Sequence, residues 1–106
     1  MKTRYLVVMM AALSVSATAF AAADGEALFN KNKCSTCHKL DNKTVGPTLK
    51  AISAKYAGDK EAPARLEKKV RDGGVGVWGT MPMPRTPQTA SDDDIKTIVE
   101  WMLSHK

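Results

Sequence analysis

The stretch Cys34-Ser35-Thr36-Cys37-His38 decides how this chain folds. Its pattern, C-x-x-C-H, places two thiols and one imidazole on a single tight turn. Thiols at this spacing can add across the two vinyl groups on one side of a porphyrin. The histidine that follows then lies beneath the iron and can ligate it as a neutral imidazole. The pattern is the attachment signature of a covalently bound c-type haem.

Three other uses of a C-x-x-C pair fit the sequence less well. A redox-active dithiol of the thioredoxin type lies between a strand and a helix, and no alternating apolar and polar run predicts a strand here. A structural zinc ion needs four nitrogen or sulfur ligands, and only His105 remains beyond the motif. A structural disulfide across two residues would restrain little chain entropy and would leave His38 without a role.

The beginning of the chain has the order of a secretory signal peptide. Lys2 and Arg4 give a positive start, residues 5–13 are apolar, and residues 14–23 are small and mildly polar. An uncleaved membrane anchor is the alternative, but it needs about 20 apolar residues, and serine and threonine interrupt this run. We therefore expect the leader to be removed.

Two cleavage points follow from the small residues of the leader, one after Ala21 and one after Ala23, and the spacing does not choose between them. The sequence thus predicts a signal peptide over residues 1–23, a mature domain over residues 24–106 and a periplasmic location. Without the leader, fourteen basic residues face eleven acidic ones, a net charge of +3. This mild charge has no dense basic run of the kind that binds nucleic acid, and it suits attraction to an acidic partner.

The spacing of apolar residues predicts about four short helices in a small all-α domain. Asp24 is an N-cap for the first helix, which runs to about Asn32. Leu49, Ile52 and Tyr56 share one face of a second helix of about two turns. A mature chain of about 83 residues has a core of marginal size, and such a domain usually needs disulfides, a metal or a bound cofactor to stabilise it.

The third and fourth helices have clear ends. Pro63 suits the first turn of the third helix, which stops at Gly73-Gly74. Ser91 caps the fourth helix, and Asp94 completes a capping box. Residues 73–89 carry four glycines and three prolines and are predicted to form a loop. The apolar stripe of the fourth helix consists of Ile95, Ile98, Val99, Met102 and Leu103.

One histidine leaves a coordination position of the iron to be filled. A strong sixth ligand makes a closed electron carrier, whereas an empty position suits a sensor, a gas carrier or a peroxidase. The candidates are Met81, Met83, Met102, His105 and lysine side chains. Met102 belongs to the stripe of the last helix, and His105 lies near the chain end, where order is poor. Met81 and Met83 lie in the loop, and prolines on both sides stiffen Met83. Packing against the haem face is the other use of either methionine.

Several short stretches add to the C-x-x-C-H pattern: Val45-Gly46-Pro47, Gly76-Val77-Trp78-Gly79, Met81-Pro82-Met83-Pro84 and Trp101-Met102-Leu103-Ser104. With them, the sequence from about Glu26 to Lys106 resembles the small bacterial cytochromes c of the c-551/c-552 type, also called cytochrome c8, a branch of class I cytochromes c. The resemblance implies about four short helices packed around one haem c, attached through Cys34 and Cys37. It also implies a monomeric electron carrier of a respiratory chain rather than an enzyme.

The resemblance carries over to particular site residues. It implies that His38 and Met83 ligate the iron, with Met81 at a position that family members usually fill with an aliphatic residue. It implies that the carbonyl of Pro47 accepts a hydrogen bond from the second nitrogen of His38 and that the indole of Trp78 donates to a haem propionate. Family members also often have glycine before the first cysteine, where this chain has Lys33.

This chain differs from the family pattern a second time, directly after Met83. Family members often continue with Pro-Pro and an asparagine that can bond the sulfur, whereas this chain has Pro84-Arg85-Thr86-Pro87-Gln88. A haem enzyme or ligand sensor is the alternative function, but Arg85 is the only candidate for a distal group near the loop. A haem subunit of a membrane complex would require the leader to persist as an anchor.

A group of lysines is expected around the haem edge: Lys31, Lys33, Lys39, Lys43 and Lys50. Single lysines are usually solvated surface, but together they suggest docking on redox proteins that have an acidic patch, such as an electron donor and a terminal reductase or oxidase. Redox encounters of this kind are small and transient.

Overall fold

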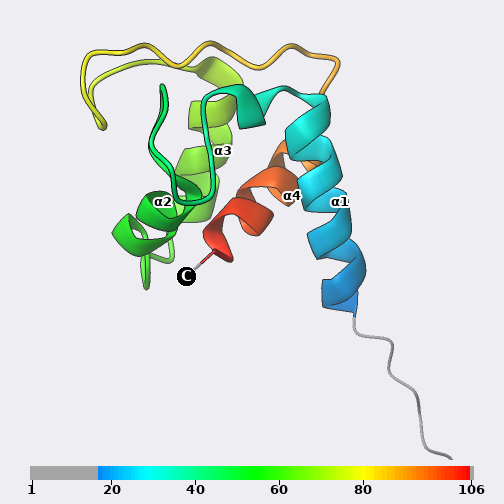
Figure 1. Ribbon diagram of the computed structural model, residues 1–106. Coiled ribbons are helices and arrows are strands. Elements are labelled where there is room, and N and C mark those ends of the chain that lie inside the picture. The colour runs from blue at the N-terminus through cyan, green and yellow to red at the C-terminus, as the bar shows by residue number, and fades with distance from the viewer. Residues whose placement is uncertain (1–16, 106) are drawn as a thin grey trace, which may run out of the picture.

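The computed structural model describes residues 17–105, with only the backbone of residues 17–23. Four α-helices and one 3-10 turn form: α1 (Ala17–Lys31), η1 (Cys34–Thr36), α2 (Leu49–Lys55), α3 (Ala62–Asp72) and α4 (Asp92–Leu103) (Figure 1). No strand occurs in this part of the chain, where one isolated bridge pairs Gly74 with Met83. The predicted all-α class is confirmed.

The first helix begins earlier than predicted. The structure starts α1 at Ala17, so Asp24 lies inside the helix, and its predicted role as an N-cap is wrong for this chain. Residues 19–23 include four alanines, and alanine has the highest helix propensity of all residues. Residues 1–16 of the predicted signal peptide lie outside the described residues. None of the helices between residues 17 and 105 is long and apolar enough to cross a membrane.

The ends of the last two helices lie where local chemistry places them. α3 has proline in its first turn and ends at Gly73, whose φ of 70° is in the left-handed region. In α4, Ser91 accepts a hydrogen bond from the amide of Asp94 at 3.0 Å, and the carboxylate of Asp94 accepts one from the amide of Ser91 at 3.3 Å. The predicted capping box is therefore confirmed.

The hydrophobic core forms on two sides of α4, which contacts all three other α-helices. One cluster joins α4 to α1 and α2 and consists of Phe29, Leu49, Ile52, Ile98 and Met102. The other joins α4 to α3 and consists of Val70, Ala90, Ile95 and Val99. A buried serine, Ser53 of α2, donates from Oγ to the carbonyl of Met102 at 2.8 Å. The core thus holds α4 at the centre of the domain.

The segment between α3 and α4 is a long loop that arches over one end of the helices, coloured yellow to orange in Figure 1. Two backbone hydrogen bonds close its first part, from Met83 N to Gly74 O at 2.8 Å and from Gly74 N to Met83 O at 3.0 Å. The prediction that residues 73–89 lack a helix is confirmed. This pairing brings Met83 back toward the end of α3.

Candidate haem site

The C-x-x-C-H stretch folds as a tight turn directly after α1. The amides of Cys37 and His38 both donate to the carbonyl of Cys34, at 3.2 and 3.0 Å, and the amide of Thr36 donates to the carbonyl of Lys33 at 3.1 Å. Both thiols are free and half-buried. Burial raises the pKa of the Cys34 thiol. Two thiols and an imidazole are thereby held within one turn.

Lys33 enters this turn in a left-handed conformation, with φ 61° and ψ 21°. Among the described residues it is the only non-glycine residue with a positive φ. A side chain in this region costs roughly 1–2 kcal/mol, and glycine avoids that cost. The glycine that family members often have at this position would adopt this left-handed conformation without strain, whereas Lys33 adopts it at a cost in free energy.

The ring of His38 is oriented by the loop that follows it. Its Nδ1 lies 2.8 Å from the carbonyl oxygen of Pro47. Because a carbonyl only accepts hydrogen bonds, Nδ1 carries the proton and donates it. The lone pair of the ring then belongs to Nε2, which is the arrangement that a metal-ligating histidine requires. The structure thus brings His38 and Pro47 together in the geometry that the family resemblance implies.

Gly46 lies close to the same ring, next to its Cε1 and Nδ1 atoms. Its amide donates to the carbonyl of Cys37 at 2.9 Å, and that carbonyl also accepts from the hydroxyl of Thr44 at 3.0 Å. A Cβ on Gly46 would lie 2.7 Å from Cε1 and 2.9 Å from Nδ1 of His38. The φ of Gly46 is not in the left-handed region, so the position needs glycine for lack of space rather than for its backbone angle.

A cavity of about 300 Å³ separates this turn from the methionine loop. Cys37 and His38 line it from one side and Met81 and Met83 from the loop. Its volume is at the lower end of the range of ligand and cofactor pockets, about 300–1,000 Å³. Large apolar side chains that line the cavity are also exposed to solvent: Val45, Val75, Val77, Trp78 and Met81.

These residues fit a haem. An exposed apolar patch of this kind marks a binding surface, and the flat face of a porphyrin would cover it. The thiols, the imidazole and the thioethers supply the bonds that a c-type haem uses. A structural zinc ion is not supported, because no three His, Cys, Asp or Glu side chains within residues 24–105 are arranged so that they could hold a metal ion.

The two loop methionines differ in their surroundings. Met83 is half-buried and packs against the cluster that contains Val70 and Ala90, and its backbone is paired with Gly74. Met81 is 65% exposed. The loop therefore holds Met83 firmly and leaves Met81 at the rim of the cavity.

Two cations near the cavity were not predicted from the sequence. Lys69 of α3 is half-buried and lines the cavity. Its spacing from Leu66 and Gly73, three and four residues away, places it on the inner face of α3 and could have indicated this position. Lys55 lies with its Nζ 5.4 Å from the ring centroid of Trp78. Trp78 itself lines the cavity and is 45% exposed.

An all-α domain with a C-x-x-C-H turn and a methionine loop across an apolar cavity defines a small protein that carries one covalent haem. The Cytochrome c family profile matches residues 22–106. The chain therefore belongs to the cytochrome c family. As a member, it binds one haem c, exchanges electrons with redox partners and is an electron carrier rather than an enzyme.

The relatives cover this chain well. Cytochrome c-551 of Pseudomonas aeruginosa is 41% identical over 106 residues, which is 100% of both chains. Cytochrome c-552 of Nitrosomonas europaea is 42% identical, also over 100% of both. A crystal structure of wild-type cytochrome c552 from Nitrosomonas europaea superposes with a TM-score of 0.71 at 43% identity, covering 76% of this chain and 99% of that one. The predicted small cytochrome c fold and the resemblance to the c-551/c-552 type are thus confirmed.

Proposed function

We propose that the mature chain is a periplasmic one-electron carrier in which Cys34 and Cys37 hold the haem and His38 and Met83 ligate its iron. One observation carries this proposal: the oriented ring of His38 and the half-buried Met83 line the same apolar cavity. When attached, the haem supplies the Fe(II)/Fe(III) couple. A thioether ligand from Met83 would favour the ferrous state.

Each residue has a defined task in this proposal. The carbonyl of Pro47 keeps the lone pair of His38 on Nε2. The apolar walls exclude water and disfavour additional charge on the iron. Trp78 lies at the cavity, where its indole N–H can donate to a propionate. Because His38 and Met83 are both held by contacts with the rest of the chain, they would hold the iron with little rearrangement during electron transfer and would leave it no open position for a substrate.

The first test uses the haem-loaded protein, made in an export-competent host that attaches haem. We expect an intact mass equal to residues 22–106 or 24–106 plus one haem. We also expect a ferric spectrum with the weak far-red charge-transfer band of methionine–iron ligation. Retention of residues 1–23 would contradict cleavage of the leader. A high-spin spectrum without the band would contradict His/Met ligation and would redirect attention to peroxidase and gas-binding assays.

The docking part of the proposal concerns the five lysines expected at the haem edge. Lys31, Lys33, Lys39, Lys43 and Lys50 are all exposed in the structure. Lys43 lines the cavity, whereas Lys50 is 3.7 Å from Asp41, which offsets part of its charge. Four of the five lysines thus have no such ion pair among the described residues, and in this proposal they provide the basic surface for an acidic redox partner.

Electron transfer with an acidic redox protein should slow as salt rises. We expect the bimolecular rate to fall by about tenfold or more between low and high ionic strength, because screening shortens the Debye length from about 30 Å at 0.01 M to about 10 Å at 0.1 M. Lys43→Gln should reduce this dependence, and Lys96→Gln on α4 should not. A neutral small-molecule reductant is the control. Stopped-flow rates that do not vary with salt would count against the basic surface.

A further inference from the structure

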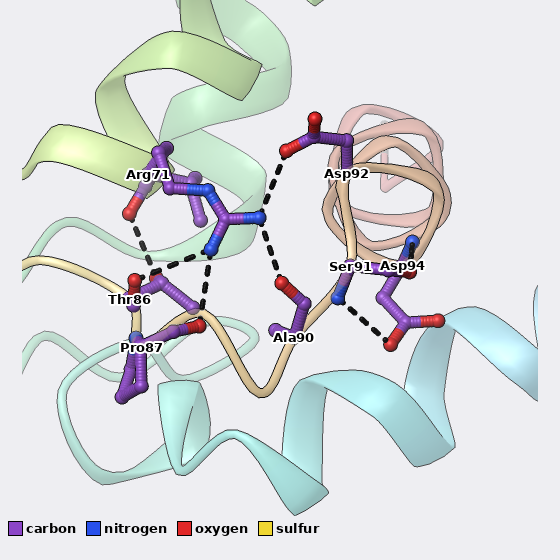
Figure 2. A network of polar contacts seen from close by, with 8 residues as sticks. Arg71, Thr86, Pro87, Ala90, Ser91, Asp92 and Asp94 are labelled. Carbon is purple, nitrogen blue, oxygen red and sulfur yellow. Dashed lines mark hydrogen bonds and ion pairs between the residues drawn. The ribbon is translucent and has the colours of Figure 1, made fainter.

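The methionine loop has a second attachment to α3, which is made by the side chain of Arg71. Its Nη1 donates to the carbonyl of Pro87 at 3.0 Å, with Thr86 O more distant at 3.4 Å. Its Nη2 donates to the carbonyl of Ala90 at 2.7 Å and to the carboxylate of Asp92 at 2.9 Å. Figure 2 shows the guanidinium lying between the loop and the start of α4. One side chain thus joins three successive parts of the chain.

The loop also bonds to the backbone at the end of α3. Thr86 donates from its amide to the carbonyls of Val70 and Arg71, both at 3.2 Å, and from Oγ1 to the carbonyl of Val70 at 2.7 Å. The last carbonyls of a helix have no partner within the helix. Thr86 therefore supplies hydrogen-bond donors to the last carbonyls of α3, and the same bonds fix the loop at this end of the helix.

These contacts bear on Met83 because it lies between the two attachments. On one side its backbone is paired with Gly74. Next to that pair, a Cβ on Gly73 would come within 2.4 Å of the carbonyl oxygen of Met83. On the other side, Thr86 and the Arg71 contacts begin three residues later. Met83 packs against the cluster that contains Val70 and Ala90, two of the residues whose carbonyls accept these bonds.

The carbonyl contacts of Arg71 should matter more than its ion pair. The side chain of Asp92 is 97% exposed, and exposed ion pairs contribute little. The side chain of Arg71 is only 16% exposed, and hydrogen bonds from a charged donor are stronger than neutral ones. Lysine could not reproduce these hydrogen bonds. The planar guanidinium of arginine reaches the Pro87 and Ala90 carbonyls with two different nitrogens, whereas lysine has a single ammonium nitrogen.

We propose that Arg71 is a positioning residue that fixes the Met83 loop and so keeps the methionine sulfur at the iron. This inference rests on the proposed His38/Met83 ligation. It assigns to Arg71 a role in the lifetime of the sulfur–iron bond, through the segment from Thr86 to Ala90. Loss of the guanidinium frees this segment and lets Met83 leave more often, while the C-x-x-C-H turn is unaffected.

The test measures how fast cyanide binds to the ferric haem-loaded protein, since cyanide enters only when the sulfur leaves. We expect Arg71→Ala and Arg71→Lys to raise the rate about tenfold or more, because two short hydrogen bonds from a charged donor are lost or misplaced. Hydrogen exchange of the Thr86 amide should accelerate in the same variants. Asp92→Asn should change neither quantity by more than about twofold, because it removes only the exposed ion pair.

A second control separates positioning from general stability. Ser53→Ala removes a buried hydrogen bond between α2 and α4, so it lowers global stability without touching the loop, and its cyanide rate should match the wild type. If neither Arg71 variant binds cyanide faster while the wild type has the far-red band, the inference is wrong. Full rescue by lysine would also overturn it. A wild type without the band would instead refute the proposed ligation. If Arg71→Ala fails to fold, Arg71→Lys still decides.

Discussion

Replacing Met83 by alanine should remove the weak far-red charge-transfer band from the ferric spectrum, and replacing Met81 should leave the band in place. The two methionines are separated by one proline and both line the cavity. Met83 is half-buried and held by its backbone pair with Gly74, whereas Met81 is 65% exposed at the rim. A ligand must keep a constant distance from the metal, and only Met83 has the contacts that fix it.

The reduction potential should change together with the spectrum. Axial ligands set haem potentials over about 0.8 V, so we expect Met83→Ala to lower the potential by on the order of 0.1 V or more, since the thioether favours the ferrous state. Met81→Ala is the matched control and should shift it far less. Absorption spectra and redox titration of both variants check the result. Loss of the band in Met81→Ala with retention in Met83→Ala would reverse the assignment.

Replacing Gly46 by alanine should destabilise the site through a single added methyl group. The added Cβ would lie 2.7 Å from the ring of His38, and neither the ring nor the Cys37 carbonyl beside it is the free end of a flexible chain. Overpacking costs about 1–3 kcal/mol, and weakening the bond to Pro47 costs about 1 kcal/mol more. We expect the free energy of unfolding of the haem-loaded protein to fall by about 2–4 kcal/mol.

Pro47→Ala gives the matched control for that change. The hydrogen bond to His38 uses the backbone carbonyl of residue 47, which alanine retains. The free energy of unfolding should therefore fall by less than about 1 kcal/mol, because alanine only gives the unfolded chain more conformational freedom than proline does. Denaturant unfolding measures both variants, and the NMR signal of the His38 Nδ1 proton should move in Gly46→Ala more than in Pro47→Ala. Equal and small effects of the two changes would argue against close contact between Gly46 and the ring.

The features that could be predicted from the sequence are those set by neighbours along the chain. The capping box of Ser91 and Asp94 spans three residues, and the proline and glycine limits of α3 depend on backbone angles that those residue types prefer. The C-x-x-C-H turn is equally local. Each of these signals is complete within one turn of helix or loop, so no tertiary information was needed.

The start of α1 was predicted wrongly because the same residues support two interpretations. Alanines before Asp24 satisfy a signal peptidase and are also the strongest helix formers. The closeness of Gly46 to His38 and the bonds of Arg71 to Pro87 and Ala90 depend on segments 8 to 19 residues apart. No periodicity of the sequence records such contacts. The inward position of Lys69 could be predicted only in part. Its helical spacing places it on the inner face of α3, but a charged side chain is normally expected in solvent.

The early start of α1 has a consequence for the maturation of the protein. Proteases cut segments that are locally unfolded, yet both proposed cleavage points, after Ala21 and after Ala23, lie inside α1. If the leader is cleaved as proposed, processing and helix formation would compete for residues 17–23. A precursor that folds first would hide its cut sites in regular helix, so removal of the leader should come before α1 forms. The order of events during export would then decide where the finished protein begins.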